Sequence, residues 1–72
     1  MEAADDPLTR LAQELERLSQ AQLALGEATA RLIPQAAPAE RRMLGQAAAA
    51  ARAAARTASE ASAKTLAASS GG

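Results

Sequence analysis

The chain has 72 residues and contains no cysteine, histidine, phenylalanine, tyrosine or tryptophan, which excludes a disulfide framework and the usual zinc sites. Alanine supplies 23 residues and leucine only nine, so large core side chains are scarce. Eight basic and eight acidic residues cancel to a formal net charge of zero, which does not favour a nucleic-acid-binding protein.

Residues 1–6 are expected to form a flexible acidic N-terminus. They contain Glu2, Asp5 and Asp6 and lack the apolar stretch of a signal peptide. The longest wholly apolar run, residues 47–51, is far shorter than the ~18 residues of a membrane span. We therefore expect a soluble, intracellular and most simply cytoplasmic protein.

A first helix is predicted over residues 7–32. Asp6 can cap free backbone N–H groups, and Pro7 suits the first helical position because its missing N–H has no partner there. Pro34 disfavours helical geometry at the residue before it, so the helix should end near Leu32.

This first helix carries apolar residues at alternating steps of three and four, the seam of a coiled coil or bundle helix. The seam comprises Leu8, Leu11, Leu15, Leu18, Gln22, Leu25, Thr29 and Leu32. One half of the seam is leucine throughout, whereas the other half weakens from leucine to Gln22 and Thr29. Gln22 would either fix the register of a partner helix or lie exposed.

Residues 33–37 form the predicted connector, which is short enough to join antiparallel helices. Pro38 restarts the helix and Glu40 favours its first turn, whereas Ala37 is a poor cap. The second helix is predicted over residues 39–68 on the strength of alanine's helix propensity. The Ser/Gly sequence of residues 69–72 should then form a flexible tail.

The second helix has an uncharged seam of mostly small residues at the same steps. It comprises Leu44, Ala47, Ala51, Ala54, Ala58, Ala61, Thr65 and Ala68. Alanine lets a neighbouring helix approach closely, so the leucine helix should pack on the alanine helix. The net charge of −3 on residues 1–37 and +3 on residues 38–72 favours the same pairing. The predicted fold is all-α, an antiparallel two-helix hairpin of coiled-coil type.

Function is predicted to be protein–protein assembly rather than catalysis. No histidine is present to activate a hydroxyl, and the clustered acids sit at spacings that point them to different helix faces. No small-molecule substrate, cofactor or metal is expected. A single core of this size rarely suffices alone, so we expect self-association into a four-helix bundle or docking to helices of a larger complex.

The predicted partner-binding residues are those of the two seams. They are Leu8, Leu11, Leu15, Leu18, Leu25, Leu32, Leu44, Ala47, Ala51, Ala54, Ala58 and Ala61. Two alternatives stay open. One is an amphipathic protein that binds lipid or another apolar surface, although alanine gains little from insertion. The other is a small regulatory peptide that folds on a partner coiled coil.

Overall fold

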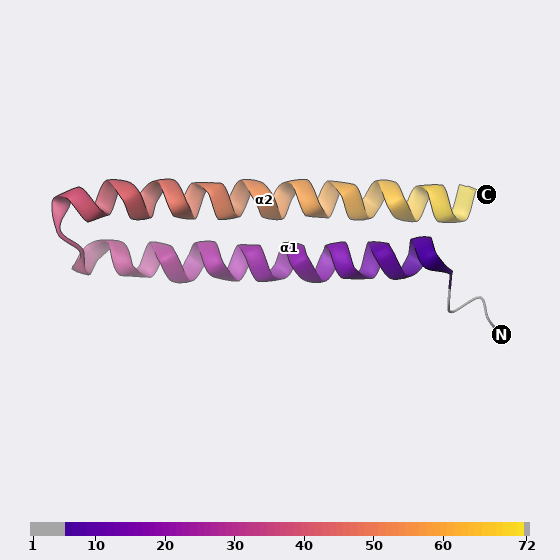
Figure 1. Cartoon of the computed structure of the whole chain (residues 1–72), viewed down its shortest axis with the longest axis horizontal. Coiled ribbons are helices and arrows are strands. Elements are labelled where there is room, and N and C mark those ends of the chain that lie inside the picture. The colour runs from indigo at the N-terminus through magenta and orange to yellow at the C-terminus, as the bar shows by residue number, and fades with distance from the viewer. Residues whose placement is uncertain (1–5, 72) are drawn as a thin grey trace.

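The computed structural model describes residues 6–71, which form two long antiparallel helices joined by a tight turn (Figure 1). Helix α1 spans Pro7–Leu32, the 3-10 turn η2 spans Ile33–Gln35, and α2 spans Pro38–Gly71. No strand occurs among these residues. The molecule measures 55 × 18 × 11 Å. The predicted all-α helical hairpin is confirmed.

Helix α1 begins as its sequence dictates. The Asp6 side chain accepts a hydrogen bond from the Leu8 backbone N–H at 3.4 Å, and Pro7 occupies the first turn. At the other end, Pro34 stops α-helical geometry and the chain tightens into η2. The turn closes with a bond from the Ala36 N–H to the Ile33 carbonyl at 3.1 Å.

Helix α2 begins at Pro38 even though Ala37 has no capping side chain. Glu40 supplies the missing interaction, because its carboxylate accepts the Ala37 backbone N–H at 3.1 Å. This is the glutamate half of a capping box. The Arg41 side chain also donates to the Ala36 carbonyl at 2.9 Å. Side chains from the first turn of α2 therefore hold the connector.

The contact between the helices is made of small residues. No large side chain is fully buried within residues 6–71. The Ser19 hydroxyl donates to the Ala55 carbonyl, and the Ser62 hydroxyl donates to the Ala12 carbonyl, each at 2.8 Å. We call the buried residues the small-residue seam: Ala12, Ser19 and Gly26 on α1, and Ala48, Ala51, Ala55, Ala58 and Ser62 on α2.

The small-residue seam corrects the packing that the sequence predicted. On α1 the seven-residue series Ala12, Ser19 and Gly26 is buried, one position beyond the predicted leucines. Five leucines that we expected between the helices are instead exposed, namely Leu8, Leu11, Leu18, Leu25 and Leu32. On α2 the same displacement buries Ala48, Ala55 and Ser62 and exposes Ala47 and Ala54, while Ala51 and Ala58 are buried as predicted.

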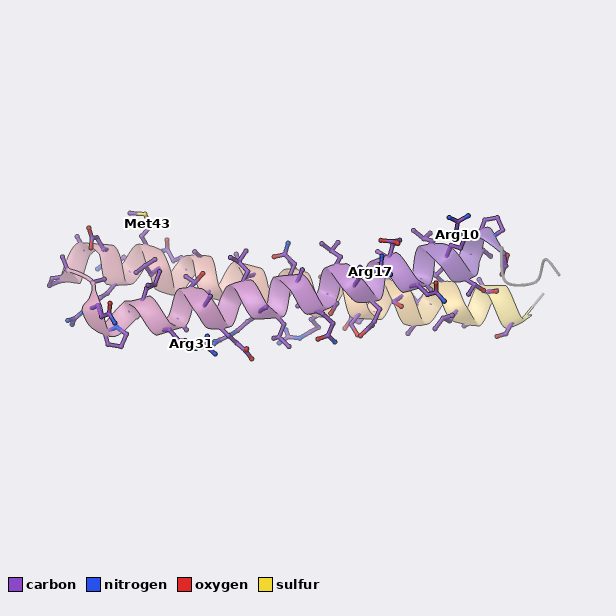
Figure 2. The ribbon with its side chains drawn as sticks, turned by 90° about the horizontal axis from the view of Figure 1, so that it is seen from below. Arg10, Arg17, Arg31 and Met43 are labelled. Atoms are coloured by element: carbon purple, nitrogen blue, oxygen red, sulfur yellow. The ribbon has the colours of Figure 1, made fainter. Side chains whose placement is uncertain are left out.

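The physical reason for this displacement is the close approach of the two backbones. A Cβ atom built on Gly26 would lie 3.3 Å from the Ala48 carbonyl oxygen, so even a methyl group at that level would require its neighbours to shift by a few tenths of an ångström. Leucine cannot enter such a contact. The helices cross at a shallow angle in the edge-on view, and side chains such as Met43 project outward from them (Figure 2).

The end of α2 also differs from the prediction. Residues 69–71 continue the helix instead of forming a tail, and the Ser69 hydroxyl donates to the Asp6 carboxylate at the start of α1. The predictions for residues 1–5 and for Gly72 lie outside the described residues.

Within residues 6–71, no ion pair joins the two helices. Within residues 6–71 the ion pair joins Arg17 to Glu14 at 2.7 Å, and both residues lie on α1.

Neither helix carries, in this part of the chain, an apolar stretch long enough to cross a bilayer.

Candidate interaction site

The small-residue seam leaves the leucines of the chain outside the helix pair. Seven of the nine are exposed, and Leu15 and Leu44 are half-buried. In α1 the exposed fractions run from 48% at Leu18 to 55% at Leu25 for the four leucines that recur every seven residues. These side chains form a continuous column about 32 Å long at the 1.5 Å rise per residue of a helix.

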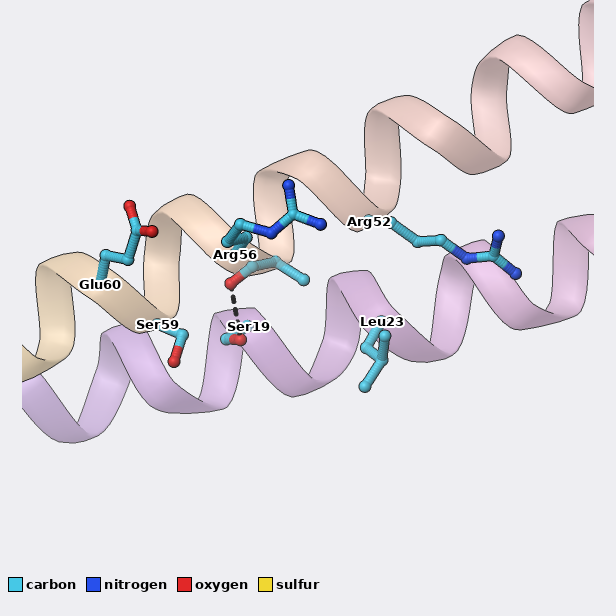
Figure 3. A pocket seen from close by; sticks show the side chains of 7 residues that line it. Ser19, Leu23, Arg52, Arg56, Ser59 and Glu60 are labelled. Atoms are coloured by element: carbon cyan, nitrogen blue, oxygen red, sulfur yellow. Dashed lines mark hydrogen bonds between the residues drawn. The ribbon is translucent and has the colours of Figure 1, made fainter.

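The side of the molecule on which this column lies follows from a groove on the opposite side. Leu23 follows the buried Ser19 by four positions, and Ser59 follows the buried Ala55 by four. Both line one shallow groove of about 390 Å³, together with Arg52, Arg56 and Glu60 (Figure 3). Residues that lie four positions after the seven-residue series on each helix therefore share one side of the hairpin. The series are Ala12, Ser19 and Gly26 on α1, and Ala48, Ala55 and Ser62 on α2.

Residues that lie one position before these two series must then share the other side. On α1 these are Leu11, Leu18, Leu25 and Leu32, and on α2 they are Ala47, Ala54, Ala61 and Ala68. Leu8, Leu15, Leu44 and the polar Gln22, Thr29 and Thr65 lie between the two columns, and the buried Ala51 and Ala58 lie beneath them. We call this surface the leucine–alanine face.

The charges of the hairpin largely avoid the leucine–alanine face. Glu14 lies at its α1 edge, and Lys64 lies at its α2 edge. Glu40 stands at the turn, where it holds the Ala37 N–H. The remaining charged residues of both helices occupy the outer and groove sides. A surface with this much exposed apolar area and so few charges is typical of an interaction site.

The groove on the other side offers a different chemistry. Arg52 and Arg56 project along it from successive turns of α2, and the Ser19 hydroxyl at its base is already bonded to the Ala55 carbonyl (Figure 3). That hydroxyl therefore serves packing rather than nucleophilic chemistry. The arginines are exposed and the groove is open to solvent.

A third feature joins the free ends of the two helices. The Asp6 carboxylate accepts hydrogen bonds from the Ser69 hydroxyl of α2 and, at 3.0 Å, from the Thr9 hydroxyl of α1. The bond from Ser69, followed by that from Thr9, lowers the pKa of Asp6 below its ordinary value of 3.8 because both stabilise the carboxylate. We call this group the Asp6 clasp.

The predicted partner-binding residues thus divide into two groups. Ala51 and Ala58 are buried against α1, while most of the others lie together on the leucine–alanine face. The sequence-based prediction missed six buried residues, namely Ala12, Ser19, Gly26, Ala48, Ala55 and Ser62. A seven-residue repeat of small residues on α1 was the available signal, but the leucine repeat beside it was the stronger hydrophobic pattern.

No group of carboxylates within residues 6–71 is placed to hold a metal ion. Comparison with protein families, with curated proteins and with solved structures finds no match to the chain.

Proposed function

We propose that this protein is a non-enzymatic helical interaction module, a small coiled-coil or bundle subunit that binds other helices through its leucine–alanine face. One observation carries the proposal: a column of leucines, about half exposed and repeating every seven residues, on a side that charges largely avoid. A seven-residue leucine repeat is the pattern by which helices pack side chains between one another.

The energetics support the same role. Covering a leucine side chain stabilises a complex by about 1.5–3 kcal/mol relative to full exposure, and alanine contributes far less. The hairpin's own contact covers alanine, serine and glycine. The leucines keep about half of their surface exposed, so a large part of the hydrophobic free energy available to this chain remains to be gained by contact with another surface.

Lipid is the second surface to consider, and the distribution of charge argues against it. An interfacial helix places lysine and arginine beside the apolar face that it inserts. Here Arg52 and Arg56 lie on the groove side, and only Lys64 borders the leucine–alanine face. A regulatory peptide that folds only on its partner would bind through the same face, and it would lack helical circular dichroism when alone.

A photo-crosslinking amino acid introduced into the full chain in its native cells tests the proposed face. Ala21 borders the leucine column, and Ala24 lies on the outer side of α1, and both are exposed. We expect protein adducts from position 21 and few from position 24, with mass spectrometry giving their identity. Equal adduct yields at the two positions, or lipid adducts alone at position 21, would contradict the proposal.

A further inference from the structure

We infer that the occupant of the leucine–alanine face is a second copy of this chain, related to the first by a two-fold axis parallel to the helices. This inference rests on the proposed function and names its partner. In the resulting four-helix bundle, the leucine column of each copy packs on the alanine column of the other.

The shape of the face suits a second copy of the chain. Its α1 half carries large side chains and its α2 half carries small ones, both at seven-residue spacing. A half-turn about the long axis exchanges the two halves, so large residues meet small ones along the whole contact. Facing positions that alternate large and small reach native packing density. A half-turn about an axis that runs across the hairpin, from α1 to α2, would instead set leucine on leucine and alanine on alanine.

The register of the two helices also suits a second copy. Ser19 lies level with Ala55, because its hydroxyl reaches that carbonyl. Leu18 is then level with residue 56, about 3 Å along the axis from Ala54 at the helical rise. Leu25 is offset from Ala47 by the same amount. A half-turn about the long axis leaves these levels unchanged, so Leu18 meets Ala54 of the second copy and Leu25 meets Ala47 of the second copy.

The charges at the edges of the face are complementary between two copies. Glu14 lies on one edge of the face and Lys64 on the other, within about 6 Å of the same level along the axis. Both side chains are exposed. The half-turn brings Glu14 of each copy beside Lys64 of the other at both edges. Repulsion between like charges would arise at neither edge.

The size of the face matches a stable dimer contact. A stripe from Leu8 to Leu32 is about 36 Å long at the helical rise, on a molecule 18 Å wide. Two copies would therefore bury roughly 1,300 Å² in total, within the ~1,200–2,000 Å² of stable protein interfaces. The face is large enough for a second hairpin without any further segment.

Sedimentation equilibrium of the purified full chain tests the identity of the occupant. We expect a mass of twice the 7.3 kDa of one chain at micromolar concentrations. A helical monomer up to several hundred micromolar would overturn the inference. It would leave the proposed function standing if the photo-crosslinking amino acid at position 21 forms adducts with a different protein.

Disulfide trapping tests the arrangement, since the chain has no cysteine of its own. Equal amounts of Leu18→Cys and Ala54→Cys are mixed, exchanged and mildly oxidised, and the products are weighed by mass spectrometry. We expect the mixed disulfide well above its statistical share, with the same result for Leu25→Cys and Ala47→Cys. The mixture of Leu18→Cys with Leu25→Cys should give little.

Circular dichroism of each variant under reducing conditions establishes that it is folded. A dimeric chain that forms little of either expected mixed disulfide overturns the leucine-on-alanine arrangement. A preference for the Leu18→Cys and Leu25→Cys pair would establish the arrangement that sets leucine on leucine instead. Both results would retain the face itself as the contact.

Discussion

At the scale of single residues, two serines connect the helices by bonds that the surrounding alanines cannot make. Ser19 and Ser62 each donate to a backbone carbonyl of the opposite helix from a buried position. They lie on different helices and about 10 Å apart along the hairpin, at the helical rise of 1.5 Å per residue. Their contributions to stability should therefore be nearly independent.

We expect Ser19→Ala to lower the free energy of unfolding by about 0.5–1.5 kcal/mol, the net contribution of a hydrogen bond. The exposed Ser59 provides the control, and Ser59→Ala should leave stability within about 0.5 kcal/mol of the native value. Urea unfolding at one fixed protein concentration measures both. If the two variants were equally stable, the Ser19 bond would have no part in the hairpin.

The two internal glycines give a second comparison. A Cβ on Gly26 would meet the Arg52 Cγ at 3.2 Å and the Ala48 carbonyl oxygen at 3.3 Å, whereas a Cβ on Gly45 would meet nothing within 4 Å. Gly45→Ala should therefore stabilise the protein by about 0.5–1 kcal/mol through helix propensity. Gly26→Ala should gain less or destabilise the protein, as thermal melting at matched concentration would show. A larger gain at position 26 would contradict the close approach of the helices.

The helical periodicity could be predicted from the sequence, but the side of each helix that packs against the other helix could not. Leu18 and Ser19 differ by one position, and hydrophobicity alone favours burying Leu18. The backbone separation at the seam decides otherwise. That separation is a property of both helices together, and the repeat of small residues at Ala12, Ser19 and Gly26 was its local signal.

At the scale of the elements, local chemistry predicted most of the boundaries. Asp6 and Pro7 start α1, Pro34 ends it, and Glu40 compensates for the poor cap at Ala37. The continuation of α2 to Gly71 was not predicted, and the Ser69 hydroxyl in its last turn bonds to Asp6, 63 positions earlier. A contact that distant in sequence leaves no local pattern.

The Asp6 clasp makes the joining of the helix ends dependent on pH. The pKa of Asp6 is lowered in the folded chain, so its contribution to stability is present above about pH 3.8 and is lost as the pH falls through the folded-state pKa. Asp6→Asn keeps a good capping residue but removes the charge. We expect it to melt below the native protein at neutral pH, with the difference narrowing below about pH 3.8.

Ser69→Ala is the matched variant on α2, because it removes the donor that lowers the Asp6 pKa most. An NMR titration of the Asp6 carboxyl should give a higher pKa in this variant than in the native chain. An unchanged pKa would show that the two helix ends are not joined in solution.

At the scale of the whole molecule, the leucine–alanine face and the groove side make opposite predictions for similar substitutions. Leu18 and Leu23 are similarly exposed, at 48% and 41%, but they lie on opposite sides of the hairpin. Leu18→Lys should weaken association at least tenfold, because each complex would lose two leucine contacts worth about 1.5–3 kcal/mol each when fully covered. Leu23→Lys should change it less than threefold.

Sedimentation velocity over a dilution series measures this difference. Equal weakening by the two lysine variants would show that the contact does not lie on the leucine–alanine face.

The overall arrangement of two antiparallel helices followed from proline positions and helix propensity. The outward leucines did not, because their place depends on how closely the backbones approach.

The central claim is that a seam of small residues leaves the leucines outside, so that the core is completed by association. Thermal melting of the unmodified chain by circular dichroism, from about 1 to 500 µM, tests it most directly. We predict a single cooperative transition whose midpoint rises with protein concentration. A midpoint that stays constant over that range, together with a sedimentation mass of 7.3 kDa, would contradict the claim.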